Sequence, residues 1–175
     1  TLQQVASQRL RMSVRQTMLF AQRLYENGHI TYMRTDSVNL SRESLEAARE
    51  TIAGEFGEKY LLDSPRVFKG KSRLAQEAHE AVRPTNPAVT PEKIQLEEAR
   101  EKKLYELIWR RFVASQMPEA RFDSTRIEID AKNPLQPTTY NLLTNGNILK
   151  FDGFLKVWHQ KFEEKELPEV NEGED

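Results

Sequence analysis

Residues 13–33 read SVRQTMLFAQRLYENGHITYM, and this stretch decides how the N-terminal part of the chain folds. Ser13 is a good helix N-cap, and the apolar residues after it recur with a period of about 3.6, which predicts an amphipathic helix. Asn27-Gly28 ends the helix, because glycine readily takes the left-handed conformation found just past a helix C-terminus. The β-branched and aromatic residues of the next segment, His29–Met33, predict a short strand.

A short helix from Leu2 to Leu10 is expected before this stretch, which gives the order helix, turn, helix, short strand. That order is typical of a winged-helix module. Two more helices are predicted, one after the N-cap Ser41 and a longer one at about Leu96–Gln116. The long helix carries apolar residues on more than one face, so it should pack on two sides. Residues 1–118 are therefore expected to form one mainly helical, winged-helix-like domain.

The composition of the chain changes after Pro118. Residues 123–130 alternate between polar and apolar side chains, as a half-exposed strand does. A second strand is expected at Thr138–Thr144, and Asn145-Gly146 is a strong signal for a hairpin turn before a returning strand. Residues 119–175 are thus predicted to form part of an antiparallel β-sheet, completed by strands from elsewhere. The predicted fold class of the whole chain is α+β.

A DNA-binding protein usually carries a net positive charge, and this chain has a net charge of −1, but its charge is unevenly distributed. Residues 1–40 carry five arginines against Glu26 and Asp36, a net charge of +3. Residues 161–175 carry two lysines against seven acidic residues, a net charge of −5. No apolar run approaches the ~20 residues of a membrane span. Zero cysteines exclude disulfides and thiolate metal sites, and they fit a cytoplasmic protein.

The residues best suited to catalysis begin at the end of the predicted strand and read Tyr32-Met33-Arg34-Thr35-Asp36-Ser37. In an extended segment, side chains two residues apart point the same way, so Tyr32 and Arg34 should reach one patch. Arginine binds two phosphate oxygens and keeps its charge, and a tyrosine oxygen can form a covalent phosphoester. On these residues alone, a tyrosine that only fills space and an Arg34–Asp36 salt bridge are the simpler interpretation.

This segment resembles the nucleophile signature of the type IA DNA topoisomerases, the bacterial topoisomerase I family. The similar residues run from Gly28 to Ser41, and a second similar block, QEAHEAVRP, covers Gln76–Pro84. The resemblance extends over nearly the whole chain, which can be laid on the middle of such an enzyme. It implies that Tyr32 is the catalytic nucleophile and that Arg34 binds the scissile phosphate and stabilises charge at phosphorus.

The resemblance also implies DNA-binding roles for His79 and Arg83 in the second block. The two residues are four positions apart, so a helical turn there would place them on one face. In the family, the corresponding histidine and arginine lie near the DNA backbone beside the active tyrosine. From the residues alone, His79 is equally explained as a structural histidine and Arg83 as the ion-pair partner of Glu77 or Glu80.

The activity that the resemblance implies is relaxation of negative supercoils without ATP. Tyr32 would attack one strand of single-stranded or underwound DNA and form a transient 5′-phosphotyrosine link, through which the other strand passes. No residues have metal-ligand spacing, so no cofactor is expected in this fragment, and Mg²⁺ is expected in the full-length enzyme through an amino-terminal domain that precedes the chain. Residues 119–175 would belong to the neighbouring arch domain, the isolated fragment is expected to be inactive, and the protein is expected to be a monomer.

Two interpretations without catalysis stay open at this point. Residues 1–40 could form a winged-helix DNA-binding module in which Tyr32 is buried. The domain could also be a purely structural hinge that opens and closes a gate. The exposure of Tyr32 separates these from the enzyme, because a nucleophile must be reachable and a core tyrosine is not.

Overall fold

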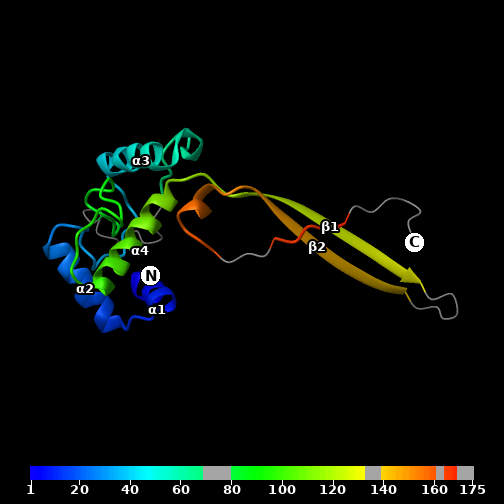
Figure 1. Cartoon of the computed structure of the whole chain (residues 1–175), viewed down its shortest axis with the longest axis horizontal. Coiled ribbons are helices and arrows are strands. Elements are labelled where there is room, and N and C mark those ends of the chain that lie inside the picture. The colour runs from blue at the N-terminus through cyan, green and yellow to red at the C-terminus, as the bar shows by residue number, and fades with distance from the viewer. Residues whose placement is uncertain (69–79, 133–138, 161–163, 169–175) are drawn as a thin grey trace. The chain divides into compact units, whose positions relative to one another are not determined.

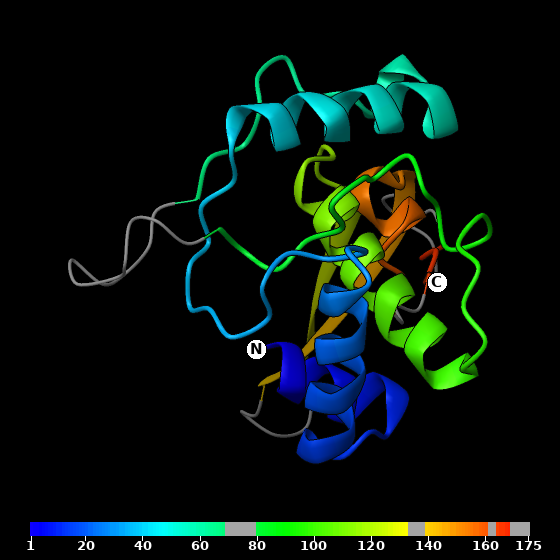
Figure 2. The same ribbon diagram turned by 90° about the vertical axis from the view of Figure 1, so that its left-hand side faces the viewer.

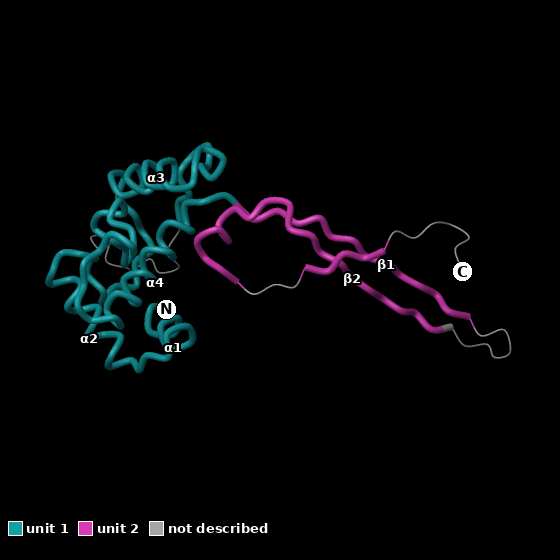
Figure 3. The backbone as a smooth tube through the Cα atoms, viewed as in Figure 1, with its two compact units in different colours: residues 1–118 teal, residues 119–175 magenta. Residues whose placement is uncertain are grey.

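Residues 1–68, 80–132, 139–160 and 164–168 are described by the structure, a computed structural model (Figure 1). The chain divides into two compact units, Thr1–Pro118 and Glu119–Asp175 (Figure 3). The helices of the first unit are α1 (Leu2–Leu10), α2 (Val14–Glu26), α3 (Arg42–Phe56), the 3-10 turn η1 (Glu58–Tyr60) and α4 (Ala99–Ser115). The second unit contains β1 (Arg121–Lys132), β2 (Thr139–Phe151) and the 3-10 turn η2 (Gly153–Lys156). The predicted α+β class is confirmed.

Local capping fixes both ends of α2, as the sequence predicts. The Ser13 hydroxyl accepts a hydrogen bond from the Gln16 amide at 3.2 Å, and the Gln16 side chain accepts one from the Ser13 amide at 3.1 Å. This reciprocal capping box satisfies two amides that a helix start leaves unpaired. At the other end, Gly28 has a φ of 72°, and the His29 amide donates to the Leu24 carbonyl at 2.8 Å. The helix therefore stops where the tyrosine segment begins.

Helix α4 is the centre of the first unit and packs against α1, α2 and α3 (Figure 2). Its buried side chains include Leu104, Tyr105, Ile108 and Trp109, so the predicted packing on two sides is confirmed. The two polar groups among them reach backbone carbonyls. The Tyr105 hydroxyl donates to Val89 at 2.6 Å, and the Trp109 indole donates to Pro87 at 2.7 Å. These bonds hold the irregular chain after residue 80 against the helix.

The second unit is built on one antiparallel pair of long strands, and the predicted turn at Asn145-Gly146 is wrong. Both residues lie inside β2, where Gly146 pairs with Thr125 of β1. The glycine serves a close approach instead of a turn, because a Cβ atom on it would lie 2.6 Å from the Lys165 carbonyl oxygen. Asn147 and Lys165 exchange backbone hydrogen bonds of 2.9 and 3.2 Å at this place. A glycine inside a strand often marks such an approach of a second backbone.

Candidate active site around Tyr32

The segment after α2 is held by pairing with residues far along the sequence. The Thr31 amide donates to the Arg83 carbonyl at 2.9 Å, and the Thr85 amide donates to the His29 carbonyl at 3.0 Å. Among the described residues, His29–Met33 contributes a single β-bridge, Ile30 with Pro84, so the strand predicted there is largely wrong. Pro84 takes the position of this pair at which no backbone hydrogen bond is made, so the missing amide hydrogen of proline costs no bond here.

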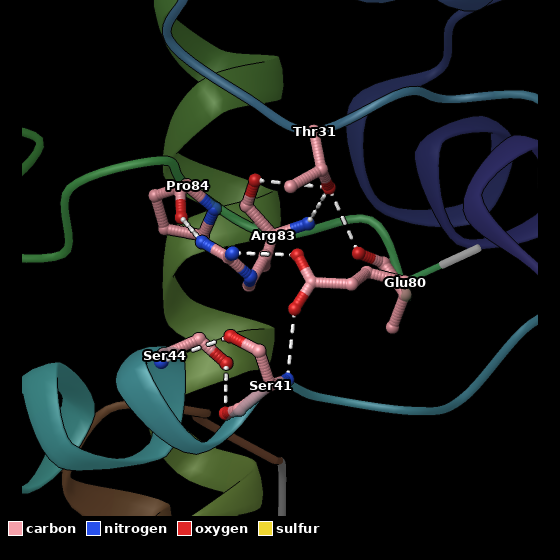
Figure 4. Close-up of polar contacts among 7 residues, drawn as sticks. Thr31, Ser41, Ser44, Glu80, Arg83 and Pro84 are labelled. Atoms are coloured by element: carbon pink, nitrogen blue, oxygen red, sulfur yellow. Dashed lines mark hydrogen bonds and ion pairs between the residues drawn. The ribbon is translucent and has the colours of Figure 1, made fainter. Parts of the chain in front are cut away.

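Thr31 strengthens this junction through its side chain (Figure 4). Its hydroxyl donates to the Ala81 carbonyl at 2.8 Å and accepts from the Arg83 amide at 2.9 Å. The Thr31 hydroxyl therefore provides a hydrogen-bond partner for both a carbonyl and an amide of residues 81–83. We call residues 80–85 the support segment, because the chain on both sides of Tyr32 is bonded to it.

The second attachment lies at the start of α3. The Ser41 amide donates to a Glu80 carboxylate oxygen at 2.8 Å, and the Ala81 amide donates to the Asn39 carbonyl at 2.8 Å. Residues 32–40, the tyrosine loop, thus run between two ends that are both fixed to the support segment. Fixing both ends of a short loop removes most of its accessible conformations. The structure brings the two family-like blocks of the sequence into direct contact.

Tyr32 lies on the surface of this loop with 42% of its area exposed. Its ring meets the ring of Tyr25, on the last turn of α2, edge to face with centroids 5.2 Å apart and planes at 65°. Met33 is buried at 6% exposure, and Arg34 is exposed like Tyr32. The alternation of exposed and buried residues puts the Tyr32 and Arg34 side chains outside the core while Met33 anchors the loop. A phenol in this position is reachable from solvent.

Short-range hydrogen bonds shape the rest of the tyrosine loop. The Thr35 hydroxyl accepts from the Ser37 amide at 3.0 Å, and the Ser37 hydroxyl accepts from the Asn39 amide at 3.1 Å. Hydroxyl-to-amide bonds two residues apart are typical of turns. Across the described ranges, Arg34 forms no ion pair, with Asp36 or with any other carboxylate. Its guanidinium is therefore available to an external anion.

Arg83 is engaged within the protein. Its side chain is 13% exposed and forms an ion pair with Glu80 at 2.6 Å, the pairing that the sequence left open. A second guanidinium nitrogen donates to the Pro84 carbonyl at 3.0 Å, while the buried Nε has no hydrogen-bond partner among the described residues. Residues 80–84 form no helical turn, so that argument for a shared face with His79 fails. His79 itself lies outside the described residues, and the DNA-binding roles of both remain predictions.

The pKa values of Glu80 and Tyr105, near the site, are shifted from their ordinary values. Burial alone would raise the pKa of Glu80, but hydrogen bonds from Ser41 and Arg83 and the charge of Arg83 outweigh it, so that the pKa is lowered. Glu80 is therefore ionised at neutral pH. Burial raises the pKa of Tyr105 to about 12. Tyr105 is 1% exposed, so its phenol is neither reachable nor readily ionised, in contrast to the exposed position of Tyr32.

Sequence reasoning missed Glu80 and Thr31 as parts of the site. One local signal indicated that the start of α3 needs an acceptor from outside the helix. A helix start of the form Ser-x-x-Glu or Ser-x-x-Gln satisfies its own N-cap amide, but the third residue after Ser41 is Ser44. The Ser41 amide therefore needs an acceptor from another part of the chain, and the sequence does not identify that acceptor.

Neither a metal site nor a membrane span is found in the parts of the chain that the structure describes. Over these residues, no three or more His, Asp or Glu side chains are grouped so that they could hold a metal ion. No described helix is both long and apolar enough to cross a membrane.

Comparisons with known proteins agree along the whole chain. A family model described as DNA topoisomerase matches residues 1–175. DNA topoisomerase 1 of Salmonella typhimurium is 48% identical over 177 residues, which cover 99% of this chain and 20% of that protein. DNA topoisomerase 1 of Mycobacterium leprae is 44% identical, with 99% of this chain and 18% of that protein covered. The chain spans about a fifth of the length of these curated relatives.

A solved structure extends the comparison to the fold. Full-length topoisomerase I from Thermotoga maritima matches with a TM-score of 0.79 at 39% sequence identity. The match covers 99% of this chain and 28% of that one. The two chains therefore share both sequence and fold over this region.

Proposed function

The chain belongs to the DNA topoisomerase family, as its resemblance to the type IA enzymes indicated, and on this premise we propose that Tyr32 is the nucleophile with which the protein cleaves one DNA strand. The observation that carries the proposal is the position of Tyr32. It lies exposed on a loop whose two ends are bonded to one support segment. Exposure gives access to a phosphodiester, and fixed ends limit the positions that the phenol oxygen can take.

The proposed reaction is a transesterification. The Tyr32 oxygen bonds to phosphorus, and the bond from phosphorus to the 3′ oxygen breaks, which leaves a 5′-phosphotyrosine link. The phenol proton goes to a base, and the departing 3′ oxygen takes up a proton. In the reverse step, the 3′-hydroxyl attacks the phosphotyrosine and restores the strand. The link keeps the energy of the broken bond, so passage of the other strand and relaxation of negative supercoils need no ATP.

Arg34 is proposed to bind the scissile phosphate. It is exposed, two residues from Tyr32, and forms no ion pair with a described carboxylate. A guanidinium stabilises the negative charge that builds up on the phosphate oxygens during attack. His79 and Arg83 are proposed to contact the DNA backbone. For Arg83 this requires DNA to compete with the Glu80 carboxylate or to use guanidinium hydrogens that Glu80 and Pro84 leave over.

The remaining parts of the machinery are proposed to lie outside this chain. Single-stranded or underwound DNA is the partner, and other domains of the same polypeptide complete the enzyme. We propose that Mg²⁺, which supplies charge neutralisation when bound, is held by an amino-terminal domain of the full-length enzyme. We further propose a monomeric, cytoplasmic protein, an arch-domain origin for Glu119–Asp175 and a winged-helix-like arrangement of α1, α2 and the segment after them.

The test is Tyr32→Phe in the full-length protein, with Tyr140→Phe as the matched control. Tyr140 lies in β2 and is 56% exposed, so both substitutions remove an accessible phenol. Tyr32→Phe should abolish covalent adduct formation with a labelled single-stranded oligonucleotide in Mg²⁺ and leave folding and DNA affinity unchanged. Tyr140→Phe should cleave like the wild type. Strand cleavage retained by Tyr32→Phe, at normal folding, would show that another residue is the nucleophile and would favour a non-catalytic DNA-binding role for residues 1–40.

A further inference from the structure

The start of α3 lacks half of its capping box. The Ser41 hydroxyl accepts from the Ser44 amide at 3.2 Å, as an N-cap residue should. Ser44 does not return an acceptor to the Ser41 amide, and its hydroxyl donates to the Ser41 carbonyl at 2.8 Å. In α2 the equivalent acceptor is the Gln16 side chain. Helix α3 therefore starts with an N-cap hydroxyl bond like that of α2 but without a local acceptor for the N-cap amide.

Glu80 supplies the missing acceptor from 39 residues away. One of its carboxylate oxygens accepts from the Ser41 amide at 2.8 Å, and the other accepts from Arg83 at 2.6 Å (Figure 4). A carboxylate at a helix N-terminus is also favoured by the helix dipole. The same side chain thus completes the cap of α3 and joins it to the support segment.

Arg83, the ion-pair partner of Glu80, is in turn bonded to Thr31, the residue before Tyr32. The Arg83 backbone is bonded in both directions to Thr31, with amide and carbonyl contacts of 2.9 Å each. The path Ser41–Glu80–Arg83–Thr31 therefore connects the two ends of the tyrosine loop outside the loop itself. The one ion pair in this path joins the Glu80 carboxylate to the Arg83 guanidinium.

We propose that Glu80 is a positioning residue for strand cleavage, which sets the distance between the ends of the tyrosine loop and thereby the place of the Tyr32 phenol. The inference rests on the proposed function of Tyr32. Glu80 touches neither the phenol nor the DNA in this scheme. Small displacements of a reacting group reduce a rate by large factors without changing how tightly the substrate binds.

The experiment compares Glu80→Ala with Glu80→Gln and the control Glu106→Ala in the full-length protein. Glu106 pairs with Arg110 at 2.8 Å on α4 and is exposed to a similar degree, 37% against 30% for Glu80. Glu80→Ala should slow single-turnover adduct formation between about 10- and 100-fold. The dissociation constant for the oligonucleotide should stay the same. Glu80→Gln keeps an acceptor for the Ser41 amide and should recover part of the rate, while Glu106→Ala should have no effect.

Limited proteolysis reports on the loop without using the reaction. Arg34 is exposed in the middle of the tyrosine loop, so trypsin can cleave after it when the loop opens. Glu80→Ala should raise the rate of this cut about fivefold or more, and Glu106→Ala should not. If Glu80→Ala does not fold, Glu80→Asp carries the same expectation, because a side chain one methylene shorter cannot reach both partners.

The outcomes separate this inference from the proposed function. Loss of cleavage in Tyr32→Phe together with a normal rate in Glu80→Ala would overturn the positioning role alone. The positioning role would also be overturned if DNA affinity fell in step with the rate, or if Glu80→Ala and Glu106→Ala were equally slow. Retained cleavage in Tyr32→Phe would overturn the proposed function and the positioning role together.

Discussion

Replacement of Thr31 by valine tests how strongly the tyrosine loop is attached to the support segment. Valine keeps the β-branched shape of threonine but has no hydroxyl, so the Ala81 carbonyl and the Arg83 amide each lose a hydrogen-bond partner. A buried polar group left unpaired costs about 1–3 kcal/mol. Both contacts are part-buried, so water replaces some of the loss, and we expect about 1–2 kcal/mol for the local free energy of opening.

Peptide-resolved hydrogen exchange in the full-length protein measures this energy where it arises. The Arg83 amide loses its acceptor, and its exchange should accelerate about 5- to 30-fold. The Thr31 amide still donates to the Arg83 carbonyl, so its own bond remains. Adduct formation should also slow, because the loop end next to Tyr32 is no longer held on both sides.

Thr51→Val is the matched control. Thr51 is also buried, at 6% exposure, but its hydroxyl donates only to the Ala47 carbonyl within α3 at 2.9 Å. A bond of this kind adds little to a helix, since the carbonyl already has a helical partner. Equal effects of Thr31→Val and Thr51→Val on exchange in the support segment would refute the idea that the Thr31 hydroxyl holds the loop.

Two further predictions concern Gly146 and the acid behaviour of Glu80. Gly146→Ala places a Cβ atom 2.6 Å from the Lys165 carbonyl oxygen and 2.8 Å from a Leu167 side-chain carbon, so hydrogen exchange in residues 164–168 should accelerate while the β1–β2 pairing persists. Gly54 lies in α3, and a Cβ atom on it would have no neighbour within 4 Å, so Gly54→Ala should instead raise the free energy of unfolding by about 0.5–1 kcal/mol. Equal effects of the two substitutions would contradict the close approach at Gly146. The lowered pKa of Glu80 means that its stabilisation is complete above its ordinary value of 4.5 and is lost as the pH falls through the lowered pKa. The difference in unfolding free energy between wild type and Glu80→Gln should therefore be constant near neutral pH and shrink below pH 4.5, and an undiminished difference in acid would count against the carboxylate.

Elements whose limits are set by near neighbours could be predicted from the sequence. Helix α2 is the clearest case, because Ser13 and Gln16 cap one end and Gly28 closes the other, all within one or two turns of the helix. The apolar faces of α4 likewise predicted its packing on two sides. Periodicity and capping are local properties, so a single sequence contains them in full.

Elements that depend on distant partners could not be predicted. Asn145-Gly146 has the composition of a hairpin turn, but the glycine is needed for the approach of Lys165, which no local pattern announces. The expected strand at His29–Met33 shrinks to one bridge, Ile30 with Pro84, because the extent of a strand depends on a partner segment more than 50 residues away. The contact of Glu80 with Ser41 also joins residues far apart in the sequence, so no local pattern predicts it. Tyr32 stood out through its resemblance to a family, since its chemistry alone did not distinguish it from an ordinary surface tyrosine.

The pairing of Asn147 with Lys165 has a consequence for how the protein behaves at high concentration. The side of β2 that does not face β1 would otherwise offer bare amides and carbonyls, the surface on which strands of separate molecules join and precipitate. Here the chain itself covers part of that edge, between Thr144 and Leu149, with Glu164 bonded to the Leu149 amide and the Lys165 ammonium bonded to Thr144. Ionic side chains along a strand edge resist intermolecular sheet growth, so this short returning segment protects the hairpin from aggregation.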